Sequence, residues 1–368
     1  MKPSVILLVL AAACGGPSAD LGPDAVACVD DASCPDGQTC SATGACSADG
    51  TCAADADCGS GMKCTDGMCT IGGCGGELLA LTYVPPNLMF VLDRSCSMNR
   101  ALTGSTTTKW TAAVGSLGTV LTDYASEIRW GLTMFPDTAG EACSQGAVPF
   151  PIADNSAGPI KAMLTAALTQ TDANFPKGPC VTNIDTGIQQ AALDPALADP
   201  ARASYLMLVS DGAQAGCDLA GSDVGTETMI SDLHVNRGIP SFIVGFGSGT
   251  DAAQLNRFAV KGGKPLAGAT KYYQADTAAQ LDQAFQAIAD LVVSCEYIVD
   301  PAPADLAQTW VYYEKTELVP HDPTHMAGWD YDAATKKMTM YGGYCDRLKT
   351  HVVDDIDVVF GCPVPPVL

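Results

Sequence analysis

The sequence predicts an α/β fold: a doubly wound, mostly parallel sheet flanked by helices, preceded by a disulfide-rich N-terminal segment and followed by a small β-rich C-terminal extension. Strand and helix patterns alternate over residues 85–295, the arrangement that produces parallel sheets. The expected central strands are continuous apolar runs such as Leu88–Leu92, typical of strands buried on both faces. Residues 28–74 hold nine cysteines, and helical periodicity is lost over residues 296–368.

The expected elements of the α/β domain follow from the spacing of apolar residues. Trp110, Leu117 and Tyr124, for example, recur at helical spacing. We expect strands at 88–92, 128–134, 205–209, 241–244 and 271–273, and helices at 110–124, 156–169, 185–193, 226–236, 251–259 and 281–292. In the extension, runs rich in β-branched and aromatic residues predict strands at 309–313, 337–341 and 355–360.

Composition and charge exclude several classes of function. The 368 residues include 41 Asp and Glu against 19 Lys and Arg, for a formal net charge of -22. A nucleic-acid-binding groove needs a basic surface, so no nucleic-acid partner is expected. The chain also has 17 cysteines, whereas disulfides are rare in the cytosol. We therefore expect an exported protein.

The first 14 residues have the pattern of an export signal. A lysine precedes the apolar run Val5–Ala13, which is too short for a membrane-spanning helix of about 20 residues. A buried N-terminal strand is the alternative. Cys14 follows three alanines, and this resembles a bacterial lipoprotein signal, with Ala11 where leucine is usual. The resemblance implies cleavage before Cys14 and a lipid anchor on its thiol, with residues 15–27 as a linker. By the same resemblance, Gly15 suits an outer-membrane destination.

The cysteines of residues 28–74 recur at nearly regular spacing. Most steps are six residues, and the segments around Cys34 and Cys58 align as a tandem repeat of 24 residues. Apolar side chains are almost absent between the cysteines, so disulfides rather than a core must hold such units together. Zinc binding is the competing interpretation, but CxxC pairs and nearby histidines are missing. We expect a spacer of two four-cysteine units.

Short oxygen-bearing side chains follow the expected central strands. The first strand runs into Asp93-Arg94-Ser95-Cys96-Ser97, and the strand at 205–209 runs into Ser210-Asp211-Gly212. Between them, Cys180–Gly187 precedes a helix and supplies further hydroxyl groups. In doubly wound sheets, ligands bind beyond the carboxyl ends of the strands. Small carboxylate and hydroxyl ligands that leave room for water suit Mg²⁺, so these loops are expected to form a cation site.

These motifs resemble those of the von Willebrand factor A (VWA) domain over residues 85–295. The matching segments are Val91–Met98, Thr182–Gly187 and Leu208–Gly212. In that family the three loops form a metal-ion-dependent adhesion site (MIDAS), which implies Mg²⁺, Mn²⁺ or Ca²⁺ as the cofactor. The metal ligands that the resemblance implies are Asp93, Ser95, Ser97, Thr182 and Asp211. The serines would bind the ion directly and the aspartates mostly through water.

The resemblance also implies a free coordination position, which a protein or other partner would fill with a carboxylate. Thr182 would bind the ion directly or through water. Thr186 is the alternative to Thr182, because both precede the same expected helix. For Asp93, the alternative role is that of a strand-end cap without metal.

Cysteines occur in two of these loops, where family members usually have glycine. Cys96 and Cys180 are therefore expected to form a bridge that fixes the spacing between the loops. Cysteine connectivity cannot be deduced from sequence, so the other pairs are hypotheses. These pairs are Cys143–Cys217, Cys74–Cys295, which would close the α/β domain at its two ends, and Cys345–Cys362.

The expected function is partner binding without catalysis. An exported, lipid-anchored cell-envelope protein, on the outer membrane or the cell surface, would bind its partner through the cation in adhesion or in the assembly of a surface complex. One alternative is a metal-dependent hydrolase on the same scaffold. It needs a general base near the ion, and the site loops contain no histidine. The other alternative is a metal-free structural module of the envelope.

Overall fold

The computed structural model describes residues 38–40, 46–48, 51–52, 62–71, 76–137, 145–178, 180–214 and 223–366. The chain forms two compact units. Unit 1 takes its described residues from Met1–Ala80, Asp300–His321 and Asp354–Leu368, and unit 2 takes its own from Leu81–Val299 and Asp322–Val353. Residues 296–368, expected as one extension, are therefore divided between the units. No helix in the described ranges combines the length and the apolar composition that crossing a bilayer requires.

Unit 2 is built on a six-stranded sheet with the strand order β11-β10-β9-β6-β7-β8. The strands are β6 (Asn87–Asp93), β7 (Arg129–Phe135), β8 (Phe150–Ala153), β9 (Ser204–Ser210), β10 (Ser241–Phe246) and β11 (Tyr273–Ala275). All neighbouring strands are parallel except β7 and β8, so the sheet is mostly parallel, as expected. Every residue of β6 is buried, in accord with its continuous apolar sequence.

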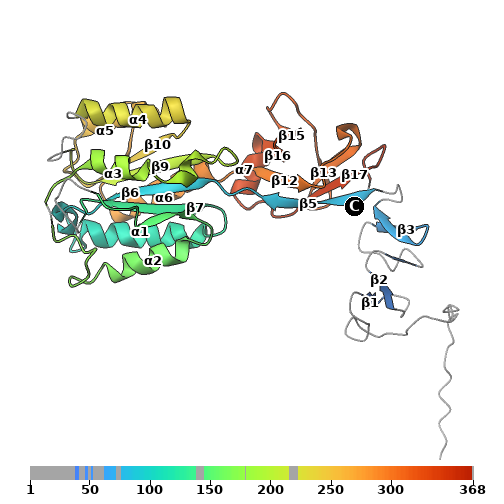
Figure 1. Cartoon of the computed structure of the whole chain (residues 1–368), viewed down its shortest axis with the longest axis horizontal. Helices are drawn as coiled ribbons and strands as arrows, with labels where there is room; N and C mark the ends of the chain where they lie inside the picture. Colours follow the sequence, from blue (N-terminus) through green and yellow to red (C-terminus); the bar gives the residue numbers. More distant parts are fainter. Residues whose placement is uncertain are drawn as a thin grey trace, which may run out of the picture. The chain divides into compact units, whose positions relative to one another are not determined.

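Helices flank this sheet on both faces (Figure 1). On one face, α1 (Lys109–Asp123), α2 (Ala157–Ala166) and α6 (Ala278–Val292) share an apolar core, and on the other, α3 (Ile184–Ala191), α4 (Asp223–Arg237) and α5 (Ala252–Lys261) share a second core. The alternation of side chains along β6 explains the two cores, since Phe90 and Leu92 belong to the first and Met89 and Val91 to the second.

Unit 2 also contains a smaller antiparallel group of strands. These are β12 (Glu296–Asp300), β15 (Gly328–Asp332) and β16 (Lys337–Tyr341), and β16 pairs with both of the others. The helix α7 (Gly343–Lys349) follows β16. The short 3₁₀ helices η3 (Cys96–Asn99) and η4 (Pro195–Ala198) complete the unit. Strand β16 has the bounds expected from the sequence, whereas β15 was not expected.

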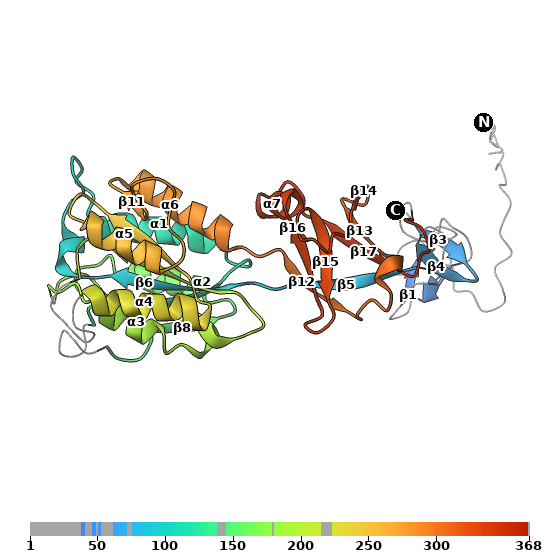
Figure 2. The same ribbon diagram turned by 90° about the horizontal axis from the view of Figure 1, so that it is seen from above.

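Unit 1 contains four antiparallel strands in the order β14-β13-β17-β5 (Figure 2). They are β5 (Glu77–Tyr83), which belongs to unit 1 as far as Ala80, β13 (Thr309–Tyr313), β14 (Glu317–Val319) and β17 (Ile356–Phe360), and η5 (Leu306–Gln308) precedes β13. The strands expected at 309–313 and 355–360 are present. Strand β5 was not expected, and it pairs with β17 across a long separation in sequence.

The described parts of the cysteine-rich segment form two hairpins. β1 (Gln38–Cys40) pairs with β2 (Cys46–Ala48), and β3 (Met62–Thr65) pairs with β4 (Met68–Ile71), both antiparallel. In each hairpin two cysteines lie opposite each other, Cys40 with Cys46 and Cys64 with Cys69. Cys64 forms its disulfide with Cys52. The two hairpins therefore share antiparallel pairing with two cysteines opposite each other.

Candidate metal centre

The candidate site lies where two central strands of unit 2 end. Asp93 is the last residue of β6, and Asp211 directly follows β9. The two strands are parallel neighbours, and Leu92 is in register with Val209. Their carboxyl ends therefore meet at one edge of the sheet, which brings the two carboxylates together across 118 positions of sequence.

Hydrogen bonds connect four of the five predicted ligands. The Ser95 and Ser97 hydroxyl oxygens lie 2.8 Å apart, and the Ser97 hydroxyl donates to Oδ1 of Asp211 at 2.7 Å. The backbone N–H of Ser95 donates to Oδ1 of Asp93 at 2.8 Å. The other carboxylate oxygen of Asp93 accepts from the Ser210 hydroxyl at 2.7 Å. Asp93, Ser95, Ser97 and Asp211 therefore form one connected group, which we call the polar cluster.

Thr182 lies beside the polar cluster, and Thr186 has a different role. A Cβ atom placed on Gly212 would be 3.3 Å from the Thr182 hydroxyl oxygen, so this hydroxyl lies next to the loop that carries Asp211. The Thr186 hydroxyl accepts from the Asn183 side chain and donates to the Asn183 carbonyl at 3.0 Å. Thr186 is therefore engaged at the first turn of α3, which favours Thr182 as the threonine of the site.

A disulfide joins two of the three loops. Cys96 and Cys180 are bonded, with their Cα atoms 4.9 Å apart, so the pair expected from the sequence is present. The bond ties η3, which contains Ser97, to the segment that carries Thr182. Because the two cysteines are 84 positions apart, the bond restricts the unfolded chain as well as the loops.

Two of the other expected disulfides are wrong. Cys295 is bonded to Cys345, with the Cα atoms 5.6 Å apart, so neither the Cys74–Cys295 nor the Cys345–Cys362 pair exists. The backbone N–H of Met340 in β16 donates to the Cys295 carbonyl, and this pairing brings Cys295 close to the start of α7. Sequence spacing does not reveal that pairing.

Five further cysteines have roles predicted from the sequence, namely Cys14, Cys74, Cys143, Cys217 and Cys362. Cys362 is disulfide-bonded. Cys14, Cys74, Cys143 and Cys217 lie outside the described residues, as do Cys28, Cys34 and Cys58. The expected Cys143–Cys217 pair and the lipid on Cys14 therefore stay predictions.

Burial places two carboxylates in an unfavourable electrostatic environment. Asp93 is fully buried and Asp211 is 3% exposed, whereas Ser97 and Thr182 are half-buried. Burial and the neighbouring Asp211 carboxylate raise the pKa of Asp93 to about 7, although hydrogen bonds from Ser210 and Ser95 oppose the rise. Two buried carboxylates side by side favour an accompanying cation, and Ser97 and Thr182 are more exposed than these carboxylates.

The donor set fits a hard divalent cation. Carboxylate and hydroxyl oxygens are the ligands that Mg²⁺ and Ca²⁺ prefer, and a divalent charge would offset the repulsion between Asp93 and Asp211. Within the described part of the chain, no group of three or more His, Cys, Asp or Glu side chains gathers as in a zinc site. The polar cluster differs from such a group because two of its four residues are serines.

Sequence reasoning missed two side chains of this site. Lys109, the first residue of α1, places its ammonium 2.7 Å from Oδ2 of Asp211, and Ser210 donates to Asp93. Ser210 lies within the matching segment Leu208–Gly212, so its place at the end of the strand was readable from the sequence. The signal for Lys109 was a cation in the first turn of a helix, where the helix dipole disfavours positive charge.

Arg94, between two predicted ligands, anchors the first loop. Its guanidinium donates to the Pro136 carbonyl and to the Asn174 side chain, both at 2.7 Å. Its backbone N–H donates to the Phe135 carbonyl. Arg94 is only 4% exposed, and this burial lowers the pKa of its guanidinium. Arg94 thus fixes the start of the loop against the end of β7.

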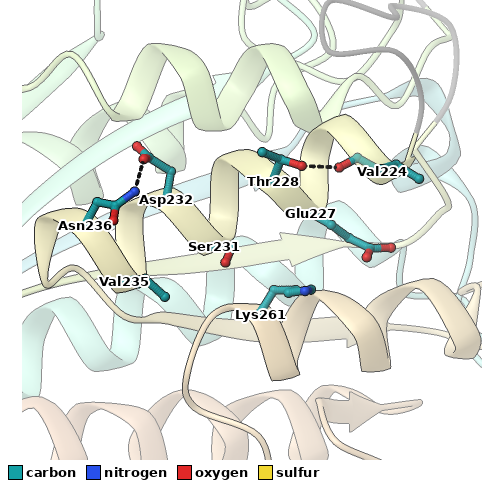
Figure 3. A pocket seen from close by; sticks show the side chains of 8 residues that line it. All are labelled: Val224, Glu227, Thr228, Ser231, Asp232, Val235, Asn236 and Lys261. Atoms are coloured by element: carbon teal, nitrogen blue, oxygen red, sulfur yellow. Dashed lines mark hydrogen bonds between the residues drawn. The ribbon is translucent and has the colours of Figure 1, made fainter.

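A second concave surface lies between α4 and α5 (Figure 3). Its volume is about 310 Å³, and its walls include Asp232 on α4 and Lys261 on α5. Asn236 donates to Asp232, and the Thr228 hydroxyl donates to the Val224 carbonyl, so these groups are bonded within α4. None of the predicted metal ligands lines this pocket. It is separate from the polar cluster.

Comparisons with known proteins give only distant likenesses. No family model matches the sequence, and no curated protein does. Among solved structures, proximal thread matrix protein 1 from the mussel byssus, with a zinc-occupied MIDAS motif, is 14% identical with a TM-score of 0.42, and the match covers 59% of this chain and 50% of that chain. The chain thus spans about half the length of the mussel protein.

Two bacterial structures are similarly distant. The PilB minor pilin from Streptococcus sanguinis is 17% identical with a TM-score of 0.42, and the match covers 57% of this chain and 62% of that chain. An aerotolerance-related membrane protein from Bacteroides fragilis is 15% identical with a TM-score of 0.39, with coverage of 55% and 99%. TM-scores this low assign neither a family nor a function.

Proposed function

We propose that unit 2 contains a doubly wound domain of the VWA type that binds a partner through a divalent cation. The residues that would hold the ion are Asp93, Ser95, Ser97, Thr182 and Asp211. The observation that carries this proposal is the polar cluster itself, in which Ser97 donates to Asp211 at 2.7 Å and also contacts Ser95 at 2.8 Å. Loops distant in sequence thus bring short oxygen ligands to one edge of a parallel sheet, where such folds bind ligands.

The cation would be Mg²⁺, with Mn²⁺ or Ca²⁺ as substitutes, and it would supply the positive charge that attracts an anionic group of the partner. The protein residues hold and orient it. The backbone N–H of Ser95 donates to one oxygen of Asp93, and the Ser210 hydroxyl donates to the other, so the Asp93 carboxylate is held in place. Because Ser97 and Thr182 are more exposed than the carboxylates, a partner would approach from their side. A carboxylate on the partner suits this arrangement.

The proposed role is adhesion or the assembly of a surface complex, without catalysis. The side chains that contact Asp93 and Asp211 are serine hydroxyls and an ammonium, which bind and orient the two carboxylates as ligands. We further propose that the chain is exported and anchored by lipid on Cys14, at the outer membrane or the cell surface. The disulfides Cys96–Cys180 and Cys295–Cys345 support export, since such bonds persist in oxidising compartments.

A pull-down from envelope extract tests the proposal. Wild-type protein is expected to retain a partner in Mg²⁺ and to release it in EDTA, and D93A is expected to retain none. The matched control is D123A, which removes an exposed carboxylate at the far end of α1. Equal retention of the partner in Mg²⁺ and EDTA would contradict a metal-dependent contact. Mass spectrometry of Cys14 tests the anchor separately, and an unmodified thiol in the mature protein would exclude it.

A further inference from the structure

We propose that Lys109 is a resident counter-cation of the polar cluster, which lowers the affinity for the metal and makes metal binding depend on an anionic partner. The inference rests on the proposed function, because it concerns the same site. It assigns to Lys109 a specificity role that the ligand set alone does not have. Without Lys109, the cluster would bind a divalent cation whether or not a partner is present.

The ion pair between Lys109 and Asp211 is short and largely shielded from water. The ammonium lies 2.7 Å from Oδ2 of Asp211, and the two side chains are 12% and 0% exposed. Ser97 donates to the other oxygen of the same carboxylate at 2.7 Å. Both oxygens of Asp211 are therefore bonded to donors of the protein itself.

The local fold holds the lysine in this position. Thr108 caps α1 by accepting from the N–H of Thr111, and the backbone N–H of Lys109 donates to the Arg100 carbonyl. A cation in the first turn is disfavoured by the helix dipole, so an opposing carboxylate is needed to retain it there. Asp211 supplies that carboxylate.

Gly247 provides the space for the lysine side chain. A Cβ atom on Gly247 would lie 2.9 Å from Cε of Lys109, and the glycine has a positive φ of +86° that other residues rarely adopt. The glycine-containing turn after β10 is thus shaped around the stem of Lys109. Elements on both sides, α1 and this turn, restrict where the ammonium can go.

The charges of the cluster show what the lysine does. With both aspartates ionised, the carboxylates and the ammonium leave one net negative charge. A divalent cation converts this to one net positive charge, which an anionic partner then neutralises. If the lysine were neutral, the cation alone would balance the two aspartates, and an anion would add unbalanced charge. Lys109 therefore disfavours the cation alone and favours the cation together with an anion.

Calorimetric titration with Mn²⁺ tests the first half of this inference. K109M is expected to bind Mn²⁺ about tenfold more tightly than wild type, because a like charge near the ion is removed. K109R keeps the charge and is expected to stay close to wild type. The matched control is K261M, which removes an exposed lysine on α5 and should leave the affinity unchanged. K109Q replaces K109M if the methionine variant does not fold.

Acetate serves as the probe for the second half. Replacing chloride with acetate is expected to raise the Mn²⁺ affinity of wild type and to leave that of K109M unchanged. If wild type binds Mn²⁺ and K109M binds it equally or more weakly, or if acetate acts on both alike, the role of Lys109 is overturned while the metal site stands. If neither protein binds Mn²⁺, the metal site falls and this inference falls with it.

Discussion

Two aspartates of unit 2 show how the same side chain meets opposite environments. Asp93 is fully buried beside Asp211, and its pKa is raised to about 7. Asp322 is only partly buried, and it accepts hydrogen bonds from the backbone N–H groups of Thr324, Met326 and Ala327. These bonds, that from Ala327 above all, hold the pKa of Asp322 below its usual range. Hydrogen bonds from its own loop stabilise the Asp322 carboxylate, whereas the Asp93 carboxylate is buried next to a second carboxylate.

The surroundings of a carboxylate indicate whether it is a candidate for function. A carboxylate surrounded by N–H donors shapes its own loop and needs no further partner. A buried carboxylate next to another carboxylate is unfavourable unless a cation accompanies it. With Lys109 counted, two ionised aspartates still leave one net negative charge in the polar cluster, so the polar cluster is the candidate site, whereas Asp322 shapes its own loop.

The largest effect is expected from removing each carboxylate in turn. D93A should weaken Mn²⁺ binding by about a hundredfold or more, because it removes an anchor of the cluster. D322A should leave the affinity unchanged. Calorimetric titration of the two variants measures both effects. Equal losses of Mn²⁺ affinity in D93A and D322A would show that burial beside a second carboxylate does not distinguish a metal ligand from a structural aspartate.

Removing the disulfide next to the cluster should affect both stability and metal binding. The double variant C96S/C180S is expected to lower the free energy of unfolding by about 2–4 kcal/mol. Its Mn²⁺ affinity should also fall, since the bond holds two of the loops together. Denaturant unfolding and calorimetry measure the two quantities.

The matched control for that variant is C295S/C345S, which removes the other disulfide of unit 2. It is expected to lower stability by a similar amount, about 2–4 kcal/mol, and to leave the Mn²⁺ affinity unchanged. An equal loss of affinity in both double variants would mean that the loss comes from general destabilisation and not from the loop spacing.

Thr182, which precedes α3, and Thr186, in the first turn of α3, should differ in their effects on metal binding and stability. T182V is expected to weaken Mn²⁺ binding by about tenfold, by removing a ligand hydroxyl. T186V removes hydrogen bonds to Asn183, so it should lower stability by about 1 kcal/mol without changing the affinity. The reverse result, with T186V weakening the affinity, would make Thr186 the ligand.

The smallest effect concerns pH and the loop at Asp322. Because folding lowers the pKa of this carboxylate, its stabilising contribution is present above the ordinary aspartate pKa of about 4 and is lost as the pH falls below it. D322N should therefore lower the melting temperature by a few degrees at neutral pH, and the difference from wild type should shrink on acidification. A difference that grows in acid would contradict the assignment.

Much of the central sheet could be predicted because its signals are local. The run Leu88–Leu92 is apolar without interruption, and β6 is buried along its whole length. The strand β5 could not be predicted, because only Leu79 is buried in it and its pairing with β17 is a tertiary contact. The helix α7 was missed as well, since it is short and has no buried residue.

The site shows the same division between local and tertiary information. Asp93, Ser95 and Ser97 lie within one motif, and the Ser95–Ser97 contact is local. The ion pair of Lys109 with Asp211 joins residues 102 positions apart, and a cation in the first turn of a helix does not reveal which carboxylate it meets. The Cys295–Cys345 pairing likewise depends on how β12 and β16 align.

Anomalous scattering from a crystal soaked in Mn²⁺ would locate the ion in the protein. We expect one ordered Mn²⁺ within coordination distance of the Ser95 and Ser97 hydroxyls, with Asp93 and Asp211 beside it. A well-ordered crystal with no Mn²⁺ in the polar cluster, or with Mn²⁺ only elsewhere on the protein, would contradict it.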